Sequence, residues 1–337
     1  MDTDKICPEE ATFERMSRKV KTGRSIFFQK TMRSLGLATA LLITTACKLP
    51  AQSEPYPFNF TQISKDNGLP HNYCHTALRD RRGFLWFGTQ DGLARYDGVR
   101  FKVYPYRDDS SGLSAPTVLD LDEDAQGVLW VATVGGGLNR FDPVTGDFTW
   151  YQNDPRDPHT LPGNNLTNFL IDTEGSIWGG GLRSGLSRMD PASARFLKCA
   201  LAQNLTTAED HLRRNSVLDI AYDSQDPQVL WLAVNDGVFR FYKNSGRLEH
   251  FRTQTPCHDV LADTPGIIWV ATDGGGIARM DKNSGRWEFF PPLPEAWAQR
   301  NLSKNLIADI SRKSDHEFWV ASLDLGFGIF DLETKHY

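Results

Sequence analysis

The chain has 337 residues, of which 40% are hydrophobic, 11% aromatic and 23% charged, and its formal net charge is −5 at pH 7. This balance excludes an intrinsically disordered chain, and the negative net charge argues against a nucleic-acid partner. Nine Trp and 20 Phe against five Met favour many short aromatic strands over a helical bundle.

Residues 1–55 form a leader that we separate from the fold. Lys and Arg residues between positions 18 and 33 precede a nearly uncharged apolar core over 35–46, an order typical of an export signal. Cleavage is expected either at Cys47, which would then carry a lipid anchor, or after Ala51. The alternative, a buried N-terminal helix, is disfavoured by Pro50 and Pro55. The sequence therefore predicts export to the periplasm or the outer surface.

Copies of one repeat fill residues 56–337, which we predict to form a single domain. The clearest copy reads Asp80-Arg-Arg-Gly-Phe-Leu-Trp-Phe-Gly-Thr-Gln-Asp-Gly-Leu-Ala-Arg-Tyr-Asp97. Its Trp recurs at intervals of 38 to 53 residues, at Trp86, Trp130, Trp178, Trp231, Trp269 and Trp319. The sixth copy departs most from the pattern, since Lys313 replaces the first Asp and Ile329 the Arg.

Each copy predicts four short strands. A first strand leads into an Asp-x-x-Gly turn, in which the carboxylate accepts hydrogen bonds from the turn backbone. The apolar stretch through the Trp is a second strand, and the glycines after it form a tight turn that needs positive φ. Gly-Leu-x-Arg-Tyr-Asp is a third strand, and an aromatic fourth follows, as in Phe148–Tyr151. We expect the Trp to be wedged between adjacent sheets.

Four antiparallel strands per roughly 40–50 residues are typical of one blade of a β-propeller. The sequence thus predicts an all-β propeller with six blades present. The sixth copy supplies three strands, and a lone strand of the fourth type is expected over 58–63. Two closures stay open: this strand completes a closed six-bladed ring, or the chain is a truncated seven-bladed ring.

The repeat resembles the two-component regulator propeller repeat, G-x-L-W-x-G-T-x-x-G-L-x-R-Y-D, which residues 83–97 match throughout. The resemblance implies the periplasmic ligand-sensing input part of a receptor whose histidine kinase or diguanylate cyclase modules are absent from this sequence. It therefore implies no enzyme activity, catalytic residue, cofactor or metal here. It also implies a small-molecule or oligosaccharide ligand, membrane attachment through a lipid anchor or a downstream helix, and a homodimer formed by downstream domains.

Function is expected where the copies differ, because loops vary on a rigid frame and carry binding. The turn after each Trp strand and the long blade connections should open onto one face, above the central channel. We expect a polar ligand there, held by Asp91, Arg183, Asn235, Asp236, Asp273 and Asp324, with His75 and His258 nearby on first strands. The alternatives are a scaffold that docks a protein partner and a propeller lyase or glycosidase, which needs axial carboxylates or a His with a metal.

Two other patterns have structural interpretations. Cys74 and Cys257 occupy a position that is apolar in other copies, which predicts buried thiols instead of metal ligands. The Arg of the third strand recurs at one position, as in Arg95 and Arg279. We expect it to support the scaffold by bonding turn carbonyls or carboxylates in every blade.

Overall fold

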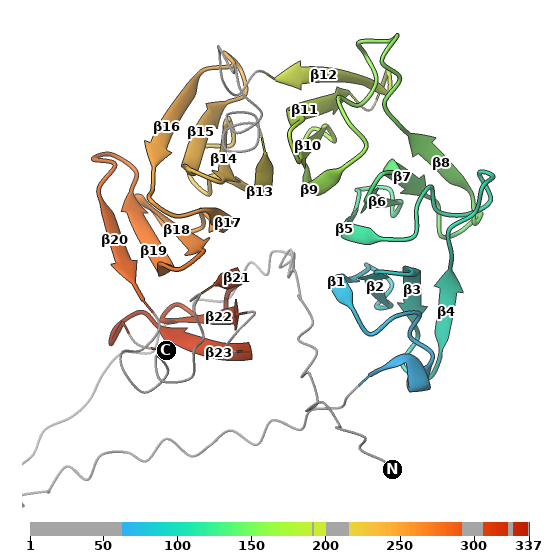
Figure 1. Cartoon of the computed structure of the whole chain (residues 1–337), viewed down its shortest axis with the longest axis horizontal. Helices are drawn as coiled ribbons and strands as arrows, with labels where there is room; N and C mark the ends of the chain where they lie inside the picture. Colours follow the sequence, from blue (N-terminus) through green and yellow to red (C-terminus); the bar gives the residue numbers. More distant parts are fainter. Residues whose placement is uncertain (1–62, 191, 200–215, 292–305, 323–325, 336) are drawn as a thin grey trace, which may run out of the picture.

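Six antiparallel sheets follow one another in chain order around a common centre (Figure 1). This computed structural model describes residues 63–190, 192–199, 216–291, 306–322, 326–335 and 337. The export signal, Cys47, the strand residues 58–62 and Asp324 lie outside the described residues. Ile63 is described, is not in a strand, and packs against the apolar cluster of the first sheet.

The strands have the following bounds. The first sheet, after a 3-10 helix over Lys65–Asn67, holds β1 (Cys74–Arg79), β2 (Leu85–Thr89), β3 (Gly92–Tyr96) and β4 (Phe101–Tyr104). The second holds β5 (Val118–Glu123), β6 (Leu129–Thr133), β7 (Gly137–Phe141) and β8 (Phe148–Tyr151). The third holds β9 (Leu166–Ile171), β10 (Ile177–Gly181), β11 (Gly185–Asp190) and β12 (Arg195–Cys199).

The other three sheets repeat this order. The fourth holds β13 (Val217–Tyr222), β14 (Val229–Val234), β15 (Gly237–Tyr242) and β16 (Leu248–Arg252). The fifth holds β17 (Cys257–Leu261), β18 (Ile267–Thr272), β19 (Gly276–Asp281) and β20 (Trp287–Phe290). The sixth holds β21 (Ile307–Arg312), β22 (Glu317–Ser322) and β23 (Gly326–Asp331).

Each sheet is one blade of the propeller. Its first strand lies nearest the centre and its last strand nearest the outside (Figure 1). First strands of successive blades pack together, from β1 against β5 through to β17 against β21. The predicted all-β propeller with six blades is therefore confirmed. Among the described residues, none of the helices has the length and apolar character of a membrane span.

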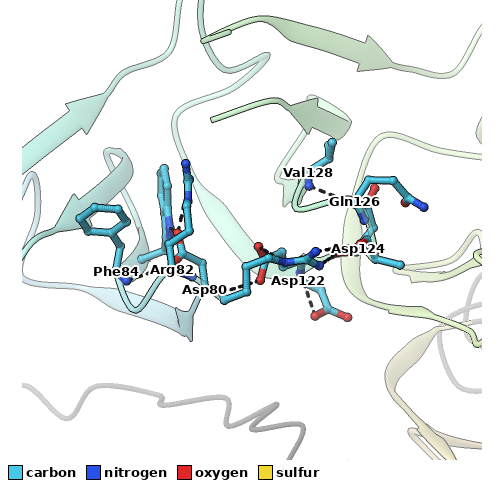
Figure 2. Close-up of polar contacts among 11 residues, drawn as sticks. Asp80, Arg82, Phe84, Asp122, Asp124, Gln126 and Val128 are labelled. Carbon is cyan, nitrogen blue, oxygen red and sulfur yellow. Dashed lines mark hydrogen bonds and ion pairs between the residues drawn. The ribbon is translucent and has the colours of Figure 1, made fainter. Parts of the chain in front are cut away.

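The Asp of each regular turn connects the turn to the second strand. One oxygen of Asp80 accepts from the amides of Arg82 and Phe84, each at 2.9 Å, and the other accepts from the indole nitrogen of Trp86 at 2.9 Å. Asp124 caps its own turn in the same way, and Figure 2 shows the two turns near each other. The Asp–Trp bond recurs at Asp172 and Asp223. A single carboxylate thus fixes both the turn and the Trp.

The Trp side chains pack between blades, as predicted. The ring of Trp86 lies 5.9 Å from that of Phe141 in the second blade, and Trp178 lies 5.5 Å from Phe241 in the fourth. The first five Trp are at most 5% exposed. Trp319 differs: it is half-buried and stacks at 4.8 Å on Phe327, which is itself exposed.

The glycine that opens each third strand has the positive φ predicted for it. Gly137 has φ +77°, and a Cβ there would lie 2.3 Å from the carbonyl oxygen of Tyr151 on β8. A side chain is therefore excluded both by conformation and by the close approach of the fourth strand.

The recurring Arg supports the scaffold, in part in the way predicted. Arg279 pairs with Glu288 at 2.6 Å, as expected. Arg240 also lies near a carboxylate, with its guanidinium 3.7 Å from Glu249, whereas Arg188 bonds the hydroxyl of Ser176. In addition, the guanidinium groups of Arg188 and Arg240 lie over the rings of Trp178 and Trp231, at 5.5 and 5.4 Å. The reason is register, because the antiparallel pairing of second and third strands places each Arg directly opposite the Trp.

Tyr337 ties the end of the described chain to the fifth blade. Its hydroxyl accepts from the amide of Ile277 at 2.8 Å and donates to the carbonyl of Phe290 at 2.9 Å. Replacing Tyr337 with Phe should lower the free energy of unfolding by about 1–3 kcal/mol, because both backbone groups lose this partner. Urea denaturation measures the loss. Tyr242→Phe, which removes a bond to Glu249 nearer the surface, should cost less, and equal losses would contradict the assignment.

Candidate functional site at the loop face

The turns between second and third strands and the connections between blades lie on one face, which we call the loop face. The amide of Val134 donates to the carbonyl of Thr117, and that of Asp273 donates to the carbonyl of Pro256, each at 2.9 Å. These bonds join each turn to the residue just before the first strand of its own blade. The amide of Gly137 also donates at 3.0 Å to the carbonyl of Asn164, which precedes the next blade.

The predicted loop residues are distributed around this face. Asp91 and Arg183 are exposed, on the first and third blades. Asn235, Asp236 and Asp273 are half-buried, on the fourth and fifth. The charge of Asp236 acts on Cys257 of the fifth blade, and the amide of Arg183 donates to the hydroxyl of Ser216, just before the fourth blade, at 3.0 Å.

Asp236 is held by the neighbouring fourth strand. Its carboxylate lies 3.1 Å from Nε2 of His250, and its carbonyl accepts from the amide of Thr253 at 3.2 Å. The His250 ring stacks on Phe239 at 4.3 Å, so the imidazole is fixed from two sides. Sequence reasoning missed His250, because the other copies give no pattern at its position.

His75 and His258 lie at irregularities of the first strands. The pairing of β1 with β2 shifts register between Cys74 and Thr76, and that of β17 with β18 shifts between Cys257 and Asp259. Such a bulge changes the direction of the side chain that it contains. Both His are half-buried. The adjacent thiols are buried, as predicted, and burial raises the pKa of Cys257 to about 12.

A ring of polar side chains follows these bulges, and the sequence interpretation missed it. The residue after the bulge in each first strand is Thr76, Asp120, Asn168, Asp219, Asp259 or Asp309. Some of these side chains accept a hydrogen bond from the next blade through Oδ2. Asp120 accepts from the amide of Phe169 at 3.0 Å, and Asp219 accepts from the amide of Val260 at 3.1 Å. The sequence could have indicated this ring, because four of the six copies have Asp at this position.

Asp259 is a member of this ring whose pKa is raised. Burial raises its pKa well above the ordinary value, and the charges of Asp219 and Asp309 and a hydrogen bond to Asp219 act in the same direction. The amide of Ile310 opposes them by donating to Asp259. In the described part of the chain, no group of three or more His, Cys, Asp or Glu side chains has the arrangement of a metal site.

The fold and the repeat together define a β-propeller in which each of the first four blades contains a turn whose Asp bonds the Trp of its own second strand. Residues 68–91 match the family model described as two component regulator propeller. The extracellular domain of a protein described as a hybrid two component system of B. thetaiotaomicron is similar, with 25% identity and a TM-score of 0.67, over 82% of this chain and 36% of that one. A second extracellular domain, from a one component system of the same organism, has 20% identity and a TM-score of 0.60, over 78% of this chain and 36% of that one.

One curated relative is a kinase. Histidine kinase P4 of Formosa agariphila is 36% identical over 86 residues, which are 25% of this chain and 6% of that protein. The chain thus spans about a third of the two extracellular domains and a small part of the kinase. The resemblance to the two-component regulator propeller that the repeat indicated is therefore confirmed.

Proposed function

We propose that this chain is the ligand-sensing propeller of a two-component-type receptor, exported to the periplasm or outer surface, and that its loop face binds a small polar ligand such as an oligosaccharide. Its likeness to extracellular domains of such systems is the observation that carries the proposal. Output modules and dimerisation would belong to other parts of the receptor. The chain itself would supply recognition without catalysis.

The chemistry of the loop face supports a sugar-like ligand. At the fourth and fifth blades, Asn235, Asp236 and Asp273 offer amide and carboxylate groups that suit hydroxyls. On the first blade, Tyr73 is 58% exposed and lies between the rings of His71 and His75, at 6.1 and 6.2 Å. An exposed aromatic face with nearby polar groups matches the apolar face and polar rim of a sugar ring.

Calorimetric titration of the full chain with a panel of oligosaccharides tests the proposal. Asp236→Ala should weaken binding about tenfold to a hundredfold, because a charged acceptor and the group that fixes His250 are lost together. Arg100→Ala changes an exposed residue in the turn between β3 and β4, on the opposite face, and should leave affinity unchanged. Failure to bind any member of the panel, or equal losses in the two variants, would count against a ligand site on the loop face.

A protein partner is the alternative occupant of the same face. Val134 and Leu182, at the tips of two neighbouring turns, are each 43% exposed, and exposed apolar residues of this kind favour protein contacts. A pull-down from membranes separates the two functions. Capture that Leu182→Asp abolishes and Asp236→Ala leaves intact would favour the scaffold.

A further inference from the structure

Arg183 on the loop face has a backbone conformation that is rare for a residue with a side chain. Its φ is +63°, in the left-handed region that favours glycine. Arg183 is the second of the three residues between the second and third strands of its blade. The same position is Gly135 in the second blade and Gly274 in the fifth, with φ of +77° and +87°. Arg183 thus adopts, at a steric cost, a conformation that two other copies reach with glycine.

The backbone of this turn is fixed by bonds that the other copies also make. The amide of Leu182 donates at 3.2 Å to the carbonyl of Asn165, the residue just before the first strand of its own blade, as the first turn residues of the second and fifth blades do. The amide of Arg183 donates to the buried hydroxyl of Ser216 at 3.0 Å, just as the amide of Gly135 donates to Oδ1 of Asn165 at 2.9 Å. The repeat therefore sets the left-handed conformation, whichever side chain the residue carries.

A side chain is not needed to build the turn. A Cβ added at Gly135 or Gly274 would have no atom within 4 Å, so a side chain at this position extends from the turn without filling a gap in the packing. Arg183 itself is exposed. Strained residues of this kind cluster at ligand sites, where the side chain has a use that offsets the backbone cost. The strain therefore marks the guanidinium group of Arg183 as a functional group of the loop face.

We propose that Arg183 binds an acidic group of the ligand, so that the loop face selects oligosaccharides that carry a carboxylate or a sulfate; this inference rests on the proposed function. A guanidinium group is always charged and makes paired hydrogen bonds to the oxygens of such groups. The acidic members of the predicted site, Asp91, Asp236 and Asp273, would repel them. The acidic group of the ligand is therefore placed at the third blade, and its neutral hydroxyls extend toward Asp236 on the fourth.

Calorimetric titration of the full chain with uronate-containing, sulfated and neutral oligosaccharides of equal length tests the inference. The parent should bind the uronate or the sulfated members at least about tenfold more tightly than the neutral ones, and added salt should reduce this preference. Arg183→Gly should abolish the preference, while its midpoint of urea unfolding stays equal or rises, because glycine adopts this φ without the steric cost. Loss of a side chain that merely supported the fold would lower the midpoint instead.

Ala194→Gly is the matched control. Ala194 has φ +54° in the turn between β11 and β12, on the opposite face, where Gly146 holds the same position in the second blade. The substitution relieves the same kind of strain and should leave every affinity unchanged. An unchanged preference or a lower urea midpoint in Arg183→Gly, or an equal change of affinity in Ala194→Gly, would overturn the inference. Binding of neutral members alone would overturn it and keep the proposed function, whereas a complete absence of binding would overturn both.

Discussion

Replacing Trp231 with alanine is expected to lower the free energy of unfolding by about 3–5 kcal/mol, which is the usual range for truncating a buried aromatic residue. Trp231 is fully buried and packs with Val260, Ile268 and Met280 of the fifth blade. Its indole N–H also donates to Asp223 at 2.8 Å. The substitution therefore opens a cavity between two blades and removes a partner from a buried carboxylate. Chemical denaturation at neutral pH measures the loss.

Trp319→Ala is the matched control, because Trp319 holds the same position in the sixth copy. It is half-buried, stacks on the exposed Phe327, and has Lys313 where the other copies have Asp, with the ammonium 5.1 Å from its ring. Less apolar surface is removed from water here, so the cost should be less than half of that at Trp231. Equal costs would show that the packing between blades is not what the repeated Trp provides.

Features that repeat within one blade could be predicted from the sequence. The Asp that caps a turn and bonds the Trp, and the glycine with positive φ before the third strand, are local and recur in most copies. The spacing of these residues in the sequence is therefore enough to predict the turn and the strands beside it. The partners of the recurring Arg were predicted in part: Arg240 and Arg279 lie near carboxylates, as expected. The contact of Arg240 with the Trp ring depends on strand register, which the repeat alone does not reveal.

Contacts between blades could not be read in the same way. Lys282 of the fifth blade reaches Asp223 of the fourth, and no spacing in the repeat predicts this pair. Within the fourth blade, His250 on β16 reaches Asp236 in the turn between β14 and β15, which the repeat does not predict either. The acidic ring could have been predicted by aligning the six first strands, because four of them have Asp at the same position. Contacts among the loop residues could not be predicted, because their variation between copies does not indicate which of these residues lie close together. Only the arrangement of blades shows that Asp236 lies near the fifth blade, where its charge helps to raise the pKa of Cys257.

Lys282→Met is expected to cost about 3–5 kcal/mol, because it leaves a buried carboxylate without its cation. The Nζ atom of Lys282 lies 3.0 Å from Oδ2 of Asp223, and their side chains are 5% and 3% exposed. The pair joins the fifth blade to the fourth, at the same carboxylate that holds Trp231. Lys335→Met is the control, since Lys335 makes a similar pair with Glu288 at 2.7 Å with both side chains largely exposed. Its loss should be much smaller, and equal losses would contradict a buried link.

The pH dependence of the Lys282→Met loss separates charge from packing. Burial acts to raise the pKa of Asp223, but bonds from the Trp231 indole, the Gln225 amide and Lys282 outweigh it and leave the pKa below its ordinary value. The stability from this carboxylate is therefore present above about pH 4 and disappears as pH falls through the lower pKa of the folded state. The difference between the parent and Lys282→Met should shrink on going from pH 7 toward about pH 2, as Asp223 becomes protonated in both. A difference that stays constant would assign the loss to the packing of the lysine chain.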